Sequence, residues 1–358
     1  MKRILITLTA LCLISIPGFT QNISIDIQDE INHELAIEIP LDINLDFDFP
    51  MEIDINMDML SNFDFGMGSF EGYSEGDWYG NWNSNDFKGD PRIEDILIIL
   101  GNDEYNADTE IIIKNINGDV KVTGYDGDEI VIKGIKELRK KRGDISDEEA
   151  AEHELKTKLY EGKLYVYVDS PNAHVEFRNG KLDYHWHWDD NDRSRVNAHF
   201  DLEIQIPKNL ALRASTVNSG DVFVEKMENG VRASNVNGSV SVKDVRGYTT
   251  ANTVNGDIEV WFLESPTQNT DFQTVNGKIE IYSPKDLSAV VTFESLHGEL
   301  YTDFEQIKRL PNRLNKEEDG DGYRYKINST SPIQIGDGAI EMGFELVNGD
   351  VYIRTRKS

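Results

Sequence analysis

The chain is poor in cysteine and in basic residues. Its 358 residues contain one cysteine, Cys12, and 36 lysines and arginines against 65 aspartates and glutamates, giving a formal net charge of −29. A single cysteine excludes an intramolecular disulfide, so we expect packing and backbone hydrogen bonds to hold the fold together. The excess of negative charge repels nucleic acid and anionic membrane surfaces, and we expect neither as a partner.

One long apolar run is present, at the N-terminus. Residues 1–20 begin with two basic residues, continue with an apolar stretch from Ile4 to Ile16, and end with small residues, a pattern typical of a signal peptide cleaved after Thr20. The stretch is short for an uncleaved membrane anchor. Leu11 before Cys12 and the apolar residues after it argue against a lipoprotein site. We expect export to the periplasm, the cell surface or the medium, with no membrane insertion after cleavage and a formal charge of −31.

Motifs for catalysis are scarce. The sequence has no phosphate-binding P-loop and no His-Glu-x-x-His zinc motif. Cleavage of the signal peptide would remove the one cysteine and with it any thiol catalysis. Carboxylates are so numerous that a pair for glycoside cleavage can be neither selected nor excluded. We therefore expect no enzyme and no cofactor, with a β-helix polysaccharide lyase or hydrolase as the alternative.

Residues 21–92 form an acidic, low-complexity segment. Apolar and acidic residues alternate from Ile23 to Met57, and Ser61 to Asp90 is rich in Gly, Asn, Ser and aromatic residues. Alternation with period two is typical of a strand, or of a disordered segment that pairs when it meets a sheet edge. From its charge and composition we expect most of this segment to be disordered.

From about Ile93 to residue 210 the pattern indicates a β-rich region with one helix. The helix is predicted over residues 146–161, beginning at Ser146 as N-cap, with Glu149 completing a capping box and Ile145 placed to pack on Ala150. It should stop at Gly162. Strands are predicted at residues 110–114, 120–123, 129–134, 163–168 and 198–206.

Residues 211–358 repeat a turn followed by an alternating strand, and residues 115–122 carry an earlier copy. The turn glycines 220, 238, 256, 277 and 298 are spaced 18, 18, 21 and 21 residues apart. Most turns precede two apolar residues separated by a polar one, as in Val240-Ser241-Val242, which predicts a strand with one buried face. The residues assigned to structural turns are Asn117, Gly118, Asn237, Gly238, Asn255, Gly256, Asn276, Gly277, Asn348 and Gly349.

Two architectures can contain such turns. In an antiparallel meander, Asn-Gly would join neighbouring strands every 8–12 residues. Here the period is about twice as long and a weaker turn lies inside it, at residues 228–230, 245–247 and 283–285. This favours a mostly β fold with a β-solenoid, whose stacked coils would align the Asn-Gly corners in a column with asparagine hydrogen bonds along it. Asn-Gly also supplies positive φ at a tight corner.

Two groups of residues could bind a ligand. His185 and His187 would share one face of a strand and could hold zinc or copper beside Asp189 and Asp190, but a site needs a third ligand, which favours an aromatic hairpin instead.

The second group follows the turn glycines. Asp221, Asp257 and Asp350 could form a column that binds a cation or sugar hydroxyls, but Ser239 and Lys278 occupy the same position in other turns. This favours a structural role in the turn.

In this combination the chain resembles the DUF4097 family of bacterial β-strand-repeat proteins, to which an adhesin role is assigned. The resemblance rests on the strand and turn from Ile113 to Val122, on Ile130 to Gly134, on the capped helix, and on the serial Val-Asn-Gly-Asp-Val motifs. It covers about residues 105–358 and leaves out the acidic segment. It implies a β-helix-like surface or periplasmic protein without known enzymatic activity. We expect an adhesin-like or structural interaction module of the cell envelope, whose flat faces bind a protein or a glycan.

Overall fold

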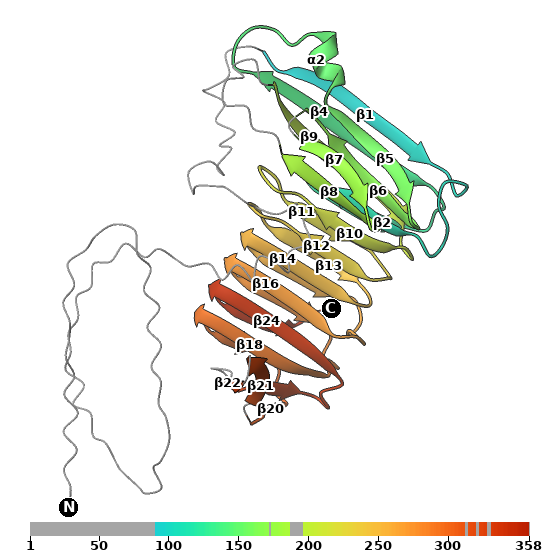
Figure 1. Cartoon of the computed structure of the whole chain (residues 1–358). Helices are drawn as coiled ribbons and strands as arrows, with labels where there is room; N and C mark the ends of the chain where they lie inside the picture. The colour runs from blue at the N-terminus through green and yellow to red at the C-terminus, as the bar shows by residue number, and fades with distance from the viewer. Residues whose placement is uncertain are drawn as a thin grey trace, which may run out of the picture. The chain divides into compact units, whose positions relative to one another are not determined.

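The computed structural model of the chain describes residues 90–171, 173–186, 196–311, 314–319, 322–327 and 331–357. The predicted signal peptide and nearly all of the predicted acidic segment lie outside these residues. The described part consists almost entirely of strands, with one short helix (Figure 1). None of its helices is both long and apolar enough to span a membrane.

Two large sheets face each other across one hydrophobic core to which both contribute side chains. The ten-stranded sheet runs in the order β1 (Arg92–Leu100), β4 (Ile130–Lys140), β9 (Val196–Pro207), β3 (Val120–Tyr125), β11 (Val222–Glu225), β13 (Val240–Val245), β15 (Ile258–Phe262), β17 (Ile279–Ser283), β25 (Val351–Thr355), β19 (Leu300–Thr302). The eleven-stranded sheet runs in the order β20 (Ile307–Arg309), β23 (Ile333–Ile335), β18 (Ala289–His297), β24 (Ile340–Asn348), β16 (Thr270–Asn276), β14 (Thr249–Asn255), β12 (Val231–Ser234), β10 (Ala211–Ser215), β2 (Glu110–Lys114), β6 (Lys163–Asp169), β5 (Glu154–Tyr160). Two separate hairpins pair β7 (Ala173–Arg178) with β8 (Lys181–Trp186) and β21 (Leu314–Asp319) with β22 (Gly322–Ile327).

The repeat region is a β-solenoid, which confirms the predicted fold and rules out the meander. Val222 of β11 pairs in parallel with Val240 of β13, and Ile258 of β15 pairs in parallel with Ile279 of β17. The paired residues lie one sequence repeat apart, because each coil gives one strand to each sheet. The apolar residues after the turn glycines point inward and are almost fully buried, except after Gly298, where Leu300 is only partly buried. The weaker internal turns carry the chain back to the eleven-stranded sheet.

The last coil in the sequence is not the last coil in space. Strands β24 and β25 insert between the coil of β16 and β17 and the coil of β18 and β19, as Figure 1 shows for β24 between β16 and β18. Phe344 of this inserted coil packs on Phe272, with ring centroids 5.5 Å apart. The glycine turn at 349 therefore follows that at 277, and the turn at 298 comes last.

The predicted helix is wrong at its C-terminal end. Helix α2 spans only Asp147–Ala151, with the predicted capping box at Ser146 and Glu149, and with Ile145 packed against the cluster that contains Ala150. The buried Lys136 donates through Nζ to the carbonyls of Ala150 and His153, at 3.0 and 3.1 Å, where the helix ends.

The residues predicted to continue the helix form strand β5, antiparallel to β6. A helix of five residues is not stable by itself, and the residues of β5 can also form a strand whose side chains alternate between the two faces of the sheet. Gly162 and Glu161 have φ of 75° and 49° and form the turn of this hairpin rather than a helix stop.

The regions on either side of residue 210 share one core. Strand β2 pairs with β10, and β3 pairs with β11, so the early Asn-Gly turn belongs to the same stack as the later ones. Strand β1 begins at Arg92, the last residue assigned to the acidic segment.

Candidate interaction surface

The turn glycines stack directly upon one another. A Cβ at Gly256 would lie 2.2 Å from the carbonyl oxygen of Gly238, and one at Gly277 would lie 1.9 Å from that of Gly256. Gly118 and Gly349 have φ of 112° and 143°, but φ is not positive at Gly256. Close approach of the coils therefore requires glycine throughout this column, and the positive φ expected from the sequence accounts for only some positions.

The asparagines before these glycines form a ladder along the stack. Asn237 donates to Asn218, Asn255 to Asn237, Asn276 to Asn255 and Asn348 to Asn276, each from Nδ2 to Oδ1 at 2.8–2.9 Å. Each amide in the middle of the ladder thus donates to one coil and accepts from the next. The predicted turn asparagines hold neighbouring coils in register.

The residue after each glycine also links coils. The backbone N–H of Asp221 donates to the carboxylate of Asp119 at 2.8 Å, and that of Ser239 donates to Asp221 at 2.7 Å. The N–H of Lys278 donates to Asp257 at 3.0 Å. Because these carboxylates bind backbone amides of the stack, the arrangement supports a structural role over a column of free acids.

A third set of polar residues was missed from the sequence. Buried side chains three or four residues before the glycines donate to glycine carbonyls; these are Asn115, Thr216, Asn235, Thr253 and Thr274. Each satisfies a carbonyl that the close stacking takes away from water. A small polar residue recurring at this spacing was the available signal.

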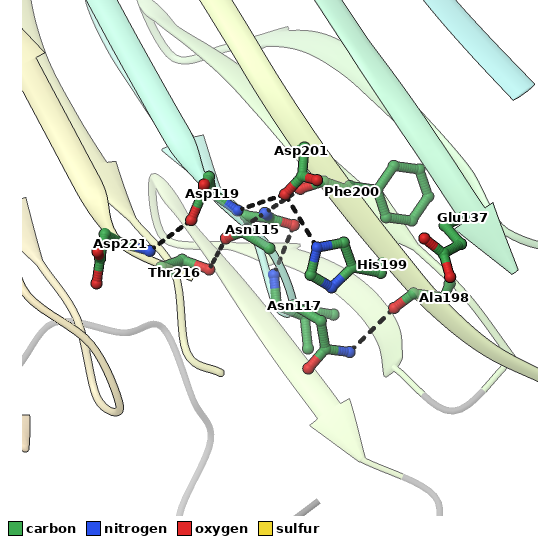
Figure 2. A network of polar contacts seen from close by, with 12 residues as sticks. Asn115, Asn117, Asp119, Glu137, Ala198, His199, Phe200, Asp201, Thr216 and Asp221 are labelled. Carbon is green, nitrogen blue, oxygen red and sulfur yellow. Dashed lines mark hydrogen bonds and ion pairs between the residues drawn. The ribbon is translucent and has the colours of Figure 1, made fainter. Parts of the chain in front are cut away.

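A histidine–aspartate pair closes the column at its β9 end. His199 Nε2 lies 2.9 Å from Asp201 Oδ1, which also accepts the backbone N–H of Asp119 at 3.0 Å, and Asn117 donates to the carbonyl of Ala198 (Figure 2). These groups continue the turn column, so we assign the pair a structural role.

The histidine metal site stays a prediction. His187 lies outside the described residues, and for His185 only the backbone is described, paired in β8 with His174. Within the described ranges, no group of three or more His, Asp or Glu side chains could hold a metal ion.

One motif also escaped the sequence argument. Residues 72–76, Gly-Tyr-Ser-Glu-Gly, fit the nucleophile elbow of α/β-hydrolases. They lie outside the described residues, and that motif acts at a strand-to-helix turn of an α/β fold.

The outer face of the ten-stranded sheet carries an aromatic cluster over β15, β17, β25 and β19. We call Trp261, Tyr282, Tyr352, Tyr301 and Arg354 the aromatic face. Tyr282 pairs in register with Trp261 on one side and Arg354 on the other, and Tyr352 pairs with Tyr301. All five alternate with buried residues on their strands or lie at the sheet end, so they point outward.

The rings of the aromatic face stack along the solenoid. Trp261 and Tyr282 lie 3.8 Å apart between centroids at 12° between planes, and Tyr301 and Tyr352 lie 5.0 Å apart at 10°. The Arg354 guanidinium carbon lies 4.9 Å from the Tyr352 centroid. Stacking fixes these side chains before any ligand arrives, which lowers the entropy lost on binding.

Acidic and basic groups border the aromatic face. The Tyr301 hydroxyl donates to Glu299 at 2.7 Å, and this bond raises the pKa of Tyr301 to about 12. The Glu280 carboxylate lies 2.8 Å from Lys278 Nζ and 3.5 Å from Arg354. The surface therefore offers hydroxyls, carboxylates and cations beside one exposed ring, Tyr301, and three half-buried rings. Sequence reasoning missed it because the outward positions become neighbours only once the coil register is known.

A perturbed carboxyl lies on the eleven-stranded sheet. Burial, and then the charge of Glu345, raise the pKa of Asp271 to about 6. Gln273 donates to Asp271 at 2.8 Å, and Asp271 lies over Gly343, where a Cβ would come within 2.5 Å of its carboxylate. Of the carboxyls with a resolved shift, this one best fits a general acid.

Comparison with known proteins identifies the family of the chain. The family model described as Toastrack DUF4097 matches residues 30–336, which includes most of the acidic segment that the sequence motifs left outside the resemblance. A search of curated proteins gave no match.

Three solved structures are similar at low identity. A proposed cell adhesion protein from Clostridium sporogenes is 13% identical, covers 75% of this chain and 100% of its own, and has a TM-score of 0.37. A proposed adhesin from Bacteroides fragilis is 11% identical, with coverage of 74% and 98% and a TM-score of 0.32. A proposed lipid-binding protein from Parabacteroides distasonis is 13% identical, with coverage of 76% and 99% and a TM-score of 0.26.

Proposed function

Because the chain belongs to the Toastrack DUF4097 family, we propose that it is an exported, non-enzymatic, adhesin-like module that binds a glycan of the cell envelope through its aromatic face. Export rests on the signal-peptide pattern of residues 1–20. The aromatic face is the observation that carries the binding proposal. Most repeated polar groups of the turns are engaged between coils, which leaves the outer faces for a ligand.

The residue types of the aromatic face support binding. Trp, Tyr and Arg dominate the binding energy of protein surfaces, because they bury much area and still hydrogen-bond. Here four rings and one guanidinium lie on four adjacent strands, and their partners Glu280 and Glu299 are acceptors for hydroxyl groups. A sugar chain offers apolar C–H faces and many hydroxyls, which matches this mixture better than an apolar protein surface does.

Glycan-array binding of the full chain tests the proposal. We expect wild-type protein to bind a subset of glycans, and a Trp261→Ala/Tyr352→Ala variant to lose that signal. Tyr248→Ala is a matched control, because Tyr248 also lies beside an arginine, Arg232, but directly before β14 of the eleven-stranded sheet. Absence of wild-type glycan binding, or equal binding by the double variant, would count against it. Capture of a protein through the same residues would replace the glycan with a protein ligand.

A polysaccharide-active enzyme is the second candidate, and Asp271 is the observation that favours it. A carboxyl that stays partly protonated near neutral pH can act as a general acid beside a second carboxylate such as Glu345. If this function is real, reducing ends should appear when envelope polysaccharides are incubated with wild-type protein, and Asp271→Asn should abolish their release. Equal release by both proteins would remove Asp271 from consideration.

A further inference from the structure

Strand β1 presents an open, apolar edge. It is the outermost strand of the ten-stranded sheet among the described residues, so its outer side has no strand partner there. Its outward residues Ile93, Leu97 and Ile99 are 61%, 63% and 54% exposed, and Ile135 on the neighbouring β4 is 47% exposed. We call these four residues the β1 strip. Their register places Ile135 opposite Asp95, between Ile93 and Leu97 on the other strand.

The other sheet ends are shorter than β1 or carry charges further along the strand, whereas the charges of β1 all lie in its first four residues and Ile96–Leu100 is apolar. Strands β19 and β20 are three residues long, and short edges offer few free backbone groups. Strand β5 carries Glu154, Lys156 and Lys158 along its edge, and charges discourage pairing with another strand. Strand β1 is nine residues long, and its outer face carries Ile93, Asp95, Leu97 and Ile99, of which three are apolar. An edge of this kind is expected to pair with a further strand.

The sequence of β1 is self-complementary in an antiparallel pairing. With a two-fold axis at Ile96, all nine residues of Arg92–Leu100 find a partner on a second copy. On the outer face Ile93 then lies opposite Ile99 of the second copy, and Asp95 lies opposite Leu97. The Ile93–Ile99 pairs are apolar and stabilise a sheet, while Asp95 faces a leucine and no two like charges lie directly opposite each other.

Charge supports the same register. Within one chain Leu97 pairs with Lys133 of β4. Asp95 of a second copy would lie opposite Leu97 on its other side, so only strand β1 would separate it from Lys133. The opposite charges lie in one row across the junction, within reach of the long lysine side chain. Glu94 is held by Lys136 at 2.5 Å and Arg92 at 2.7 Å on its own chain, so it brings no unpaired charge to the seam.

We propose that the protein forms a two-fold dimer through antiparallel pairing of β1 with β1 of a second copy, joining two ten-stranded sheets into one. The β1 strips of both copies then lie side by side and exclude water from each other. Each chain carries a net charge of −29, so the copies repel one another at low salt. Dimerisation therefore strengthens as salt screens this repulsion, and the glycan proposal for the aromatic face does not depend on it.

Sedimentation of the full chain at low and high salt tests the dimer. Wild-type protein is expected to be dimeric, more completely so at high salt, and Leu97→Lys is expected to be monomeric with an unchanged far-ultraviolet spectrum. Leu296→Lys is the matched control, because Leu296 is 74% exposed on the eleven-stranded sheet. It should remain dimeric. If Leu97→Lys does not fold, Ile99→Thr, which keeps β-propensity, takes its place.

Cross-linking fixes the register. An Ile93→Cys/Ile99→Cys variant in a Cys12→Ser background should form covalent dimers on mild oxidation, since cross-strand neighbours lie within disulfide distance. A monomeric wild type, a dimer that survives Leu97→Lys, or no covalent dimer would each overturn the proposal. Association of β1 with a different partner while the chain stays monomeric would overturn it as well.

Discussion

Replacement of Gly256 by alanine separates the two reasons for a glycine in the turn column. Its φ is not positive, so alanine is allowed there by backbone conformation. The new Cβ, however, would lie 2.2 Å from the oxygen and 2.5 Å from the carbon of the Gly238 carbonyl. Both atoms belong to backbone that cannot rotate away, so the two coils must separate by about 1 Å to reach ordinary contact distance.

The cost follows from the bonds that this separation strains. Three backbone hydrogen bonds join the two coils beside the turn: Gly238 N–H to Asn255 O at 3.0 Å, Val240 N–H to Asp257 O at 2.9 Å, and Asn255 N–H to Val236 O at 2.8 Å. At about 1 kcal/mol net for each bond, their loss destabilises the fold by about 3 kcal/mol. Overpacking in a core has a similar cost, about 1–3 kcal/mol.

Urea unfolding followed by circular dichroism measures this effect, with Gly143→Ala as the matched control. Gly143 has φ of 80° and no atom within 4 Å of its would-be Cβ, so alanine there carries only conformational strain. We expect about 1 kcal/mol for Gly143→Ala, the cost of a left-handed conformation, and about three times as much for Gly256→Ala. Equal losses, or a larger loss at Gly143, would refute the argument from close stacking.

Three further substitutions have defined outcomes in the same unfolding assay. Asn255→Asp removes the amide donor to Asn237 and should cost about 1–2 kcal/mol at pH 7, recovered in acid when the carboxyl is protonated. Folding raises the pKa of Asp271 from 3.8 to about 6, so the neutral carboxyl contributes fully to stability below pH 4, and this contribution is lost as the pH rises through 6. Asp271→Asn should therefore raise the free energy of unfolding by about 2 kcal/mol at pH 7 and change it little at pH 4. Lys136→Met leaves Glu94 and two carbonyls without their buried ammonium and should lower the free energy of unfolding by about 3–5 kcal/mol. The exposed Lys158 lies 4.0 Å over the Phe177 ring, so Lys158→Met should cost no more than about 1 kcal/mol.

The coil itself was predictable because its signals are local. Turns of the Val236-Asn237-Gly238 type recur with a spacing of one coil. The apolar residues that follow at alternating positions, such as Val240 and Val242, show which face of the strand is buried. The capping box at Ser146 is likewise encoded within four residues. Such features need no knowledge of the distant chain.

The parts that sequence reasoning missed depend on which coil lies beside which. Sequence spacing shows the length of a coil but not its neighbours, so the insertion of β24 and β25 after β17 left no signal in the repeat. The aromatic face went unseen for the same reason, since Trp261 and Tyr282 become neighbours through register alone. Strand β5 was predicted as helix because its residues fit both the helical period of 3.6 and the strand period of 2. Its pairing with β6, which the sequence does not show, selects the strand.

The affinity of the aromatic face for a glycan tests the central claim most directly. The glycan that binds wild-type protein most strongly on an array should be titrated against wild type, Trp261→Ala/Tyr352→Ala and Tyr248→Ala. The account predicts that Kd rises at least tenfold for the double variant, a loss of about 1.4 kcal/mol or more, and stays unchanged for Tyr248→Ala. Equal Kd values for all three proteins would contradict it.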